Sequence, residues 1–344
     1  MTTPITASQV KELRERTGAG MSDCKKALEA TGGDIDKAAE KLRTDGMAKA
    51  DKKGGRTAAE GVIAMASDAG SVVLVEVNSE TDFVSKGDEF QGLAAAAAQA
   101  ALKHKPADLA ALLALDVGGE TLEEKRRALI AKLGENMTIR RFEIVNKAAG
   151  EIAAYLHGTK IGAVVALNTG SAEVAKDVAM HVAASNPRFL DVSQISAEVL
   201  ATERRIIEAT VAQEQAEAKA ESDKLAGFLK EMDGEKTNGH YDGLSAEGKK
   251  EWDDEYATIK KKFGGGYKAK PAEIQSKMLD GKVAKFVNEI TLLGQPFVKN
   301  PDETVEKLLA SQKASVARFV RFAVGDGIEK AQTDFAAEVA AAGG

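Results

Sequence analysis

The chain alternates between stretches with the two-residue repeat of β-strands and stretches with the longer repeat of amphipathic helices. Two pairs of apolar runs, at 61–77 and 151–167, have turn residues at their centres and predict two β-hairpins. An alanine-rich helical pattern follows each hairpin, and a helix leading into an alternating strand closes each set, at 121–145 and 303–324. The order strand, strand, helix, helix, strand thus occurs twice. It predicts an α+β fold with two three-stranded antiparallel sheets covered by helices.

The regions around this repeat are helical in pattern. Residues 5–45 predict three short helices, and Thr6 with Gln9 is placed to form a capping box at the start of the first. Residues 50–61, ADKKGGRTAAEG, carry glycines and lysines without an apolar period, which predicts a flexible linker. The second repeat is interrupted by residues 186–300, whose pattern is helical almost throughout. We expect this stretch to form a helical arm.

The distal part of this arm contains two further amphipathic stretches. Apolar side chains recur at helical spacing in 225–232 and in 252–263, with the turn-rich sequence DGEKTNGHYDGLS between them. Ser245 is placed to cap the second helix, and the glycines at 264–266 end it. We expect the two helices to pack together as an antiparallel hairpin. The aromatic side chains of the second stretch are either the core of this hairpin or an anchor for a partner.

Composition excludes several classes of protein. A chain of 344 residues exceeds a usual single domain, so several modules are expected. The longest stretch without charge is too short and too rich in alanine to span a bilayer, and the N-terminus lacks the pattern of a secretory signal. A single cysteine, Cys24, allows no internal disulfide and fits a cytoplasmic protein. A net charge of −6 gives no basic surface for direct binding of nucleic acid.

The usual marks of a catalytic centre are missing from the sequence. It contains no phosphate-binding loop of the Walker type and no H-E-x-x-H motif. The histidines are scattered over different modules: His104, His157, His181 and His240. We therefore expect a protein that is not an enzyme and that holds no cofactor or metal.

The most unusual short stretch is VNSETDFVSK, at the end of the apolar strand 71–77. Its polar residues predict a turn in which Thr81 or Asp82 caps a helix beginning near Val84. Phe83 has no apolar partner in register there. It either folds back onto the sheet as a hydrophobic staple or is exposed for a partner, and the pattern leaves both alternatives open.

Several motifs resemble those of bacterial elongation factor Ts, the family of guanine-nucleotide exchange factors for elongation factor Tu. The longest are EVNSETDFVSK and LRERTGAGMSDCKKAL, and the resemblance continues through HGTKIG, MHVAASNPRFL, LLGQPFV and VRFAVGDGIEKAQTDFAAEV. It implies a three-helix unit similar to ubiquitin-associated domains, a duplicated core, a helical hairpin inserted in the second repeat and a short C-terminal helical module. It does not explain residues 218–270, which stand where this family usually has a short turn.

The resemblance and the repeat together give the expected domain boundaries. They are 1–54 for the three-helix domain and the start of the linker, 55–146 for the first core subdomain, 147–185 with 287–325 for the second core subdomain, 186–286 for the arm including 218–270, and 326–344 for the C-terminal module.

The resemblance implies that Thr81, Asp82, Phe83 and Val84 disturb the magnesium and phosphate site of elongation factor Tu, so that GDP leaves. Further contacts are implied for residues of the three-helix unit and of the core: Arg14, Met21, Lys25, Leu133, Gly134, His157, Phe297 and Val298. For some of these a plain structural role is the alternative: a core leucine at a helix end, a glycine that stops a helix, and a histidine in a turn.

Two questions about partners stay open at this stage. The chain is expected to bind elongation factor Tu, with no direct contact to nucleic acid or membrane, as a monomer, a homodimer or a two-to-two complex. The alternative function, which needs no resemblance, is a non-catalytic adaptor that uses the three-helix unit to grip a peptide or a helix.

Overall fold

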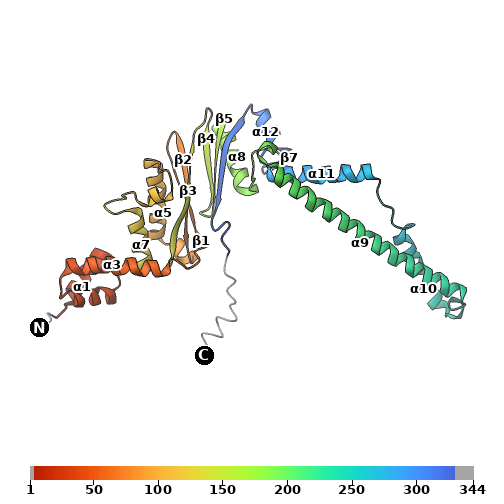
Figure 1. Ribbon diagram of the computed structural model, residues 1–344, viewed down its shortest axis with the longest axis horizontal. Coiled ribbons are helices and arrows are strands. Elements are labelled where there is room, and N and C mark those ends of the chain that lie inside the picture. Colours follow the sequence, from red (N-terminus) through yellow and green to blue (C-terminus); the bar gives the residue numbers. More distant parts are fainter. Residues whose placement is uncertain (1–3, 330–344) are drawn as a thin grey trace. The chain divides into compact units, whose positions relative to one another are not determined.

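The computed structural model describes residues 4–329, so part of the expected C-terminal module, including the second TDF sequence at 333–335, lies outside the described residues. The chain divides into two compact units, one formed by residues 1–190 with 296–344 and the other by residues 191–295. Each unit is described by itself. The first holds the three-helix unit and both sheets, and the second holds the helical arm (Figure 1).

The three-helix unit is formed by α1 (Ala7–Thr17), α2 (Met21–Ala30) and α3 (Ile35–Lys53). The capping box at the start of α1 is confirmed, because Thr6 accepts from the Gln9 backbone and the Gln9 side chain accepts from the Thr6 backbone. A small core holds the helices together, and it includes Leu13, Leu28 and the buried Cys24. Cys24 is therefore a small core residue.

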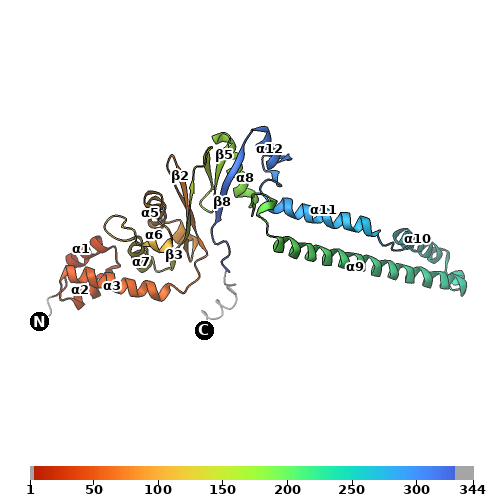
Figure 2. The ribbon, with the colours of Figure 1, turned by 45° about the horizontal axis from the view of Figure 1, so that its top comes forward.

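The prediction of a flexible linker over 50–61 is wrong at both ends of this stretch. Helix α3 continues to Lys53, beyond the ends of α1 and α2, and packs along α7 (Leu122–Leu133) (Figure 2). Asp51 of α3 pairs there with Arg127 of α7 at 3.0 Å. The first strand begins at Glu60. Between them, the carbonyl oxygens of Gly54 and Arg56 accept hydrogen bonds from the Asn136 side chain. Tertiary contacts overrode a composition that is typical of linkers.

The first sheet has the order β1-β2-β3 and is antiparallel. Helices α5 and α7 cover its outer face, where Phe90 and Ile130 are fully buried. Two short helices, α4 and α6, lie in the connections. The elements are β1 (Glu60–Ser67), β2 (Ser71–Ser79), α4 (Asp82–Ser85), α5 (Asp88–His104), α6 (Leu109–Leu113), α7 (Leu122–Leu133) and β3 (Met137–Asn146).

The second sheet repeats this order as β4-β5-β8, with α8 on its outer face. The elements of this repeat are β4 (Ile152–His157), β5 (Ile161–Thr169), α8 (Ala172–Ser185), β6 (Pro296–Phe297), β7 (Asn300–Thr304), α12 (Val305–Ser311) and β8 (Ser315–Ala323). Strands β6 and β7 pair only with each other, in a separate two-stranded sheet. The two copies differ in the connection between the second strand and the helix that follows it. Residues 80–87, which include α4, join β2 to α5, whereas Gly170 and Ser171 alone join β5 to α8.

The inner faces of the two sheets pack against each other through an apolar cluster that includes Ile63, Leu74, Val164 and Phe322. Gly162 permits this close approach, because a Cβ atom there would lie 2.8 Å from Cγ2 of Ile63. The core therefore has two layers of helix outside two layers of sheet. The α+β prediction with a duplicated sheet is confirmed.

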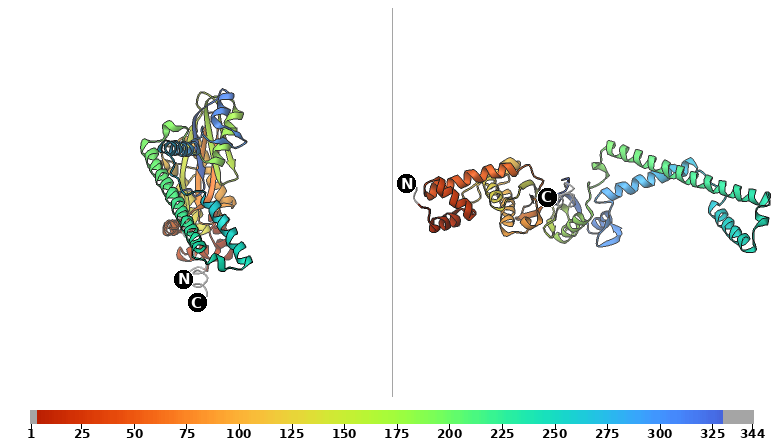
Figure 3. Two further views of the ribbon diagram at one scale, coloured as in Figure 1. Left: turned by 90° about the vertical axis from the view of Figure 1, so that its right-hand side faces the viewer. Right: turned by 90° about the horizontal axis from the view of Figure 1, so that it is seen from below.

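The arm consists of η1 (Val192–Gln194), α9 (Ala197–Thr237), η2 (Tyr241–Gly243), α10 (Ala246–Phe263) and α11 (Ala272–Ile290), drawn in green to light blue in Figure 3. Helices α9 and α11 are joined by ion pairs of 3.2 Å, Arg204 with Asp280 and Lys282 with Glu214. Among the described residues, none of the helices combines the length and the apolar character that a membrane crossing requires.

The distal hairpin is confirmed in its packing but not in its first helix. Stretch 225–232 is part of the 41-residue helix α9, which continues to Thr237 before the turn that leads into α10. Ser245 caps α10, and Gly264 ends it in the left-handed conformation. Trp252 is only 8% exposed, and its indole N–H donates to Glu235 at 2.8 Å. The core alternative for these aromatic residues is therefore the correct one.

Candidate functional site

The turn after β2 presents an isolated aromatic side chain. Thr81 is extended and caps the one-turn helix α4, since its hydroxyl oxygen accepts from the Val84 N–H at 3.4 Å. Asp82 is the first residue of this helix and not its cap. The Phe83 side chain is 83% exposed, so the alternative in which it folds back onto the sheet is wrong. A large apolar side chain is thus held in solvent at a defined place in the fold.

Hydrogen bonds on both sides of Phe83 fix its base. The Ser79 hydroxyl donates to the Thr81 carbonyl at 2.8 Å, and the Ser85 hydroxyl donates to the Asp82 carbonyl at 3.0 Å. The Gln91 side chain, from α5, donates to the Ser85 carbonyl at 2.6 Å. The exposed ring therefore stands on a backbone whose carbonyl groups on both sides are held by side chains of the fold.

Asp82 is held as an anion beside Phe83. The Lys86 ammonium group donates to its carboxylate at 2.6 Å, and this hydrogen bond is the main cause that lowers the pKa of Asp82 below its ordinary value. The positive charge of Lys160, which lies in the turn between β4 and β5, lowers the pKa further. At neutral pH the turn therefore presents the carboxylate of Asp82 next to the exposed ring of Phe83.

The structure brings several of the other expected residues to the same end of the sheets. Gly134 ends α7 with a left-handed φ of 81°, and the next residue, Glu135, accepts hydrogen bonds from Thr81. Leu133 is 39% exposed there. His157 is exposed at the end of β4, in the turn that also holds Lys160.

That second turn is tied to the first sheet next to Thr81. Lys160 pairs with Glu60 at 2.9 Å, and Glu60 lies opposite Ser79 in the pairing of β1 with β2. Residues 80–84, 133–135 and 157–160 therefore form one surface, which we name the loop edge.

The expected residues of the three-helix unit lie on α1 and α2. Met21 begins α2 and is 49% exposed, while Arg14 and Lys25 are also exposed. The turn between the two helices adjoins the end of α7, because a Cβ atom on Gly18 would lie 3.4 Å from the Lys132 ammonium nitrogen. The three-helix unit thus borders the loop edge at the residue before Leu133.

The last two expected residues behave differently from each other. Phe297 is only 4% exposed, and its ring lies 6.0 Å from that of the buried His181 of α8. Its side chain is therefore part of the core of this chain, and a contact of this residue with a partner stays a prediction. Val298 is 45% exposed, and its N–H donates to His181 at 3.2 Å.

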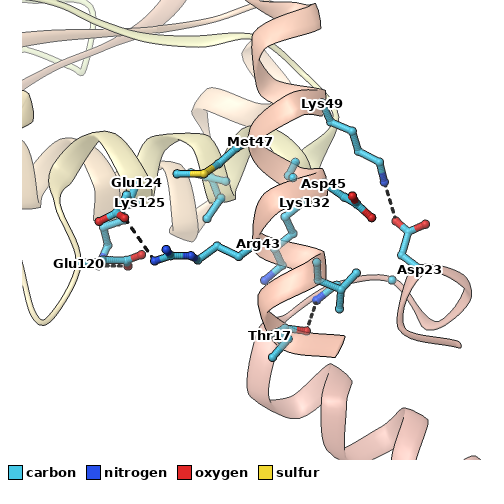
Figure 4. A pocket seen from close by; sticks show the side chains of 18 of the residues that line it. Thr17, Asp23, Arg43, Asp45, Met47, Lys49, Glu120, Glu124, Lys125 and Lys132 are labelled. Atoms are coloured by element: carbon cyan, nitrogen blue, oxygen red, sulfur yellow. Dashed lines mark hydrogen bonds and ion pairs between the residues drawn. The ribbon is translucent and has the colours of Figure 1, made fainter. Parts of the chain in front are cut away.

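A groove of about 1160 Å³ is lined by residues of α1, α2, α3, α5 and α7, and nothing in the sequence indicated it. Its floor is apolar and its rim carries charges that are paired within the protein: Lys49 points to Asp23 at 3.0 Å and Arg43 to Glu124 at 3.3 Å (Figure 4). These two ion pairs neutralise part of the rim charge, so they do not indicate an occupant. Within residues 4–329 the structure also contains no group of side chains suited to hold a metal ion.

The fold and the loop edge define a class of protein that acts through its surface, with a rigid duplicated core that presents one exposed aromatic turn. The family model described as elongation factor TS matches residues 80–326. Proteins named elongation factor Ts are similar along nearly the whole chain. That of Methylococcus capsulatus is 46% identical over 340 residues, which is 98% of both chains. That of Chromobacterium violaceum is 47% identical over 338 residues, again 98% of both. The chain belongs to the elongation factor Ts family.

Proposed function

We propose that this chain is a cytoplasmic translation factor that binds elongation factor Tu and promotes the release of GDP from it. Membership of the elongation factor Ts family supports this function over that of a plain adaptor. The single observation that carries the mechanism is the position of Phe83, which is 83% exposed on a turn whose backbone is fixed on both sides. An adaptor that grips its partner with the three-helix unit gives no reason for this exposure.

The proposed mechanism acts on the magnesium ion of elongation factor Tu without touching it. Magnesium requires near-octahedral coordination and keeps several waters, which the surrounding protein groups orient. Asp82 and Phe83, inserted beside that site, displace the groups that orient the waters. The phosphates of GDP then lose part of their neutralising charge, and GDP dissociates. This chain contributes no chemical step and holds no nucleotide itself.

Phe83 cannot supply the whole driving force. Burial of a phenylalanine side chain in the partner contributes about 1.5 to 3 kcal/mol. The remaining loop-edge residues and the exposed residues of the three-helix unit therefore have to contribute binding energy as well: Leu133, Gly134, His157, Arg14, Met21 and Lys25. On the second repeat, the exposed Val298 is the candidate for a contact with elongation factor Tu, and the buried Phe297 anchors its segment in the core.

The function is tested by mixing catalytic amounts of the chain with elongation factor Tu that carries labelled GDP. The wild-type chain is expected to accelerate release of the label, and Phe83→Ala is expected to reduce the acceleration at least tenfold, since it removes about 1.4 kcal/mol or more of burial. Phe228→Ala is the matched control, because Phe228 is 54% exposed but lies on α9 in the arm. An inert wild-type chain would favour the adaptor.

Thermodynamic linkage provides a second readout of the same substitution. If GDP and this chain weaken each other's binding to elongation factor Tu, the two factors are equal, because they belong to one cycle. Phe83→Ala should shrink both factors together. A variant in which exchange falls while GDP still weakens the complex as in wild type would remove Phe83 from the coupling.

The stoichiometry of the complex stays a prediction. The chain is expected to act as a monomer, a homodimer or a two-to-two complex with elongation factor Tu, without contact to nucleic acid or membrane. Light scattering on the purified complex distinguishes these states by mass.

A further inference from the structure

A carboxylate far away in the sequence holds the turn that carries Phe83. Glu135 is 54 residues from Thr81, and its two oxygens accept both available donors of that residue. The Thr81 N–H donates to Oε2 at 3.0 Å, and the Thr81 hydroxyl donates to Oε1 at 2.7 Å. Hydrogen bonds to an ionised carboxylate are stronger than bonds between neutral groups. Thr81 is thus fixed in position and its hydroxyl proton is committed to Glu135.

The hydrogen bond from the Thr81 hydroxyl to Glu135 also determines how Thr81 caps α4. With its proton directed at Glu135, the Thr81 hydroxyl can only accept from the Val84 N–H, which is the bond that starts α4. Helix α4 has four residues, and a single turn is too short to be stable by itself in water. The direction in which the Phe83 side chain points therefore depends on hydrogen bonds to residues outside the turn, such as those of Thr81 to Glu135.

The residues on either side of Glu135 connect the same turn to the end of α3. The Lys53 ammonium group donates to the Gly134 carbonyl, and the Asn136 side chain donates to the Arg56 carbonyl at 2.7 Å. The Asn136 N–H donates to the Glu80 carboxylate at 2.6 Å. Residues 134–136 therefore lie between the three-helix unit and the turn, and they are bonded to both.

We propose that Glu135 is a positioning residue for nucleotide exchange, which holds the Thr81–Phe83 turn in the orientation that inserts the ring into the partner. Glu135 acts through Thr81 and needs no contact with elongation factor Tu. The proposal rests on the proposed function. It implies that Glu135 contributes to the rate of GDP release in the bound complex more than to the affinity of the complex.

Glu135→Gln is the informative substitution. A glutamine side chain has nearly the same size, but its single carbonyl oxygen accepts from only one Thr81 donor, and its amino group then faces the other donor. The maximal rate of GDP release at saturating factor is expected to fall about tenfold, while the half-saturating concentration changes less than about twofold. Glu151→Gln is the control, because Glu151 is a surface carboxylate bonded to Lys147 at 2.8 Å in the second repeat.

Substitutions of Thr81 separate positioning from a general effect on the fold. Thr81→Val removes the hydroxyl, and with it both the bond to Glu135 and the cap of α4, so it should lower the maximal rate at least as much as Glu135→Gln does. The double variant should lose less than the sum of the two losses, since both changes disturb the bond between the hydroxyl and Glu135. Thr81→Ser keeps the hydroxyl and should retain several times the rate of Thr81→Val. Additive losses, or equal rates for the two Thr81 variants, would overturn the proposal.

A measurement without the partner makes failure of this proposal distinguishable from failure of the proposed function. Hydrogen exchange of the Thr81 amide, which donates to Glu135, should be faster in Glu135→Gln than in wild type, with the exchange of core amides unchanged. Unchanged Thr81 exchange, or faster Thr81 exchange with a wild-type maximal rate, would contradict the positioning role. An inert wild-type chain would instead contradict the proposed function.

Discussion

At the scale of single residues, Glu76 shows how a buried charge organises the core. Its side chain is fully buried in β2 and accepts hydrogen bonds from Arg141 at 2.6 Å, from the Gly325 N–H at 2.8 Å and from Asn78 at 3.1 Å. Burial by itself raises the pKa of Glu76, but the bonds from Gly325, Asn78 and Arg141 outweigh it and hold the pKa below its ordinary value. Glu76 thus joins β2, β3 and the segment that follows β8 through one carboxylate.

This network predicts a specific pH dependence of stability. Because the folded-state pKa of Glu76 lies below the ordinary 4.5, its contribution is present above that pH and is lost as the pH falls through the folded-state pKa. Glu76→Gln should lower the free energy of unfolding by about 3 kcal/mol at pH 7, because Arg140 and Arg141 lose their partner. The variant should also lose less stability than wild type when the pH falls from 5 to 3.5, as urea titrations would measure.

The matched control for this prediction is Glu151→Gln on the protein surface. Its side chain is 44% exposed, so the substitution should change neither the stability at pH 7 nor its pH slope by more than about 0.5 kcal/mol. A Glu76→Gln variant that keeps the wild-type slope would show that another carboxylate carries the acid response.

Residues whose role is set by their neighbours in sequence could be predicted, and residues whose role is set across the fold could not. The Thr6 capping box and the helix stop at Gly134 depend on a few adjacent positions, so the pattern alone indicated them. Glu135 is bonded to Thr81 across 54 residues, and no local feature marks it. Phe297 was expected to contact the partner because the resemblance implies it, but only the packing against His181 shows that its side chain points inward.

At the scale of elements, the helices α3 and α9 both run further than the sequence pattern predicted. Composition suggested a linker after residue 49 and a separate helix near residue 225, yet both segments continue a helix. In α3 the added turns pack on α7, and in α9 they pack on α10. Helix ends are set by tertiary contacts of this kind as much as by propensity.

The arm can be shortened to test where the active surface lies. Replacing residues 218–270 with a short glycine and serine turn keeps the ion pairs of Arg204 with Asp280 and of Lys282 with Glu214, which join α9 to α11. All residues of the loop edge belong to the other unit. The shortened chain should therefore promote GDP release within about threefold of wild type, which is under about 0.7 kcal/mol. A folded variant without exchange activity would place the distal arm in contact with elongation factor Tu.

At the scale of the whole molecule, the two units should unfold separately. Within the described part of the arm few side chains are fully buried, whereas both repeats of the core bury continuous apolar clusters. A unit that buries less apolar surface is less stable. The chain provides one natural probe in each unit, because its single tryptophan, Trp252, lies in the arm and its single cysteine, Cys24, lies buried in the three-helix unit.

A urea titration with both probes tests this expectation. The change in Trp252 fluorescence should have a midpoint at least about 1 M below the urea concentration at which Cys24 becomes reactive to a thiol reagent. Far-ultraviolet circular dichroism should then show two steps. Coincident transitions for all three signals would mean that the arm and the core unfold as one cooperative unit.

The connections of the two repeats differ in length, and each repeat carries a different added feature. Each half closes its own sheet and covers it with its own helices, so a connection can lengthen without disturbing the hydrogen bonds of the strands it joins. In the first half, the link from β2 to the next helix is long and carries Phe83. In the second half, the corresponding link consists of Gly170 and Ser171 alone. The second half instead accommodates residues 191–295 between α8 and β6. The second half therefore shows what the first would be without its long link. Replacing residues 80–87 with the two-residue link of the second half would give a chain that folds but lacks the exposed Phe83.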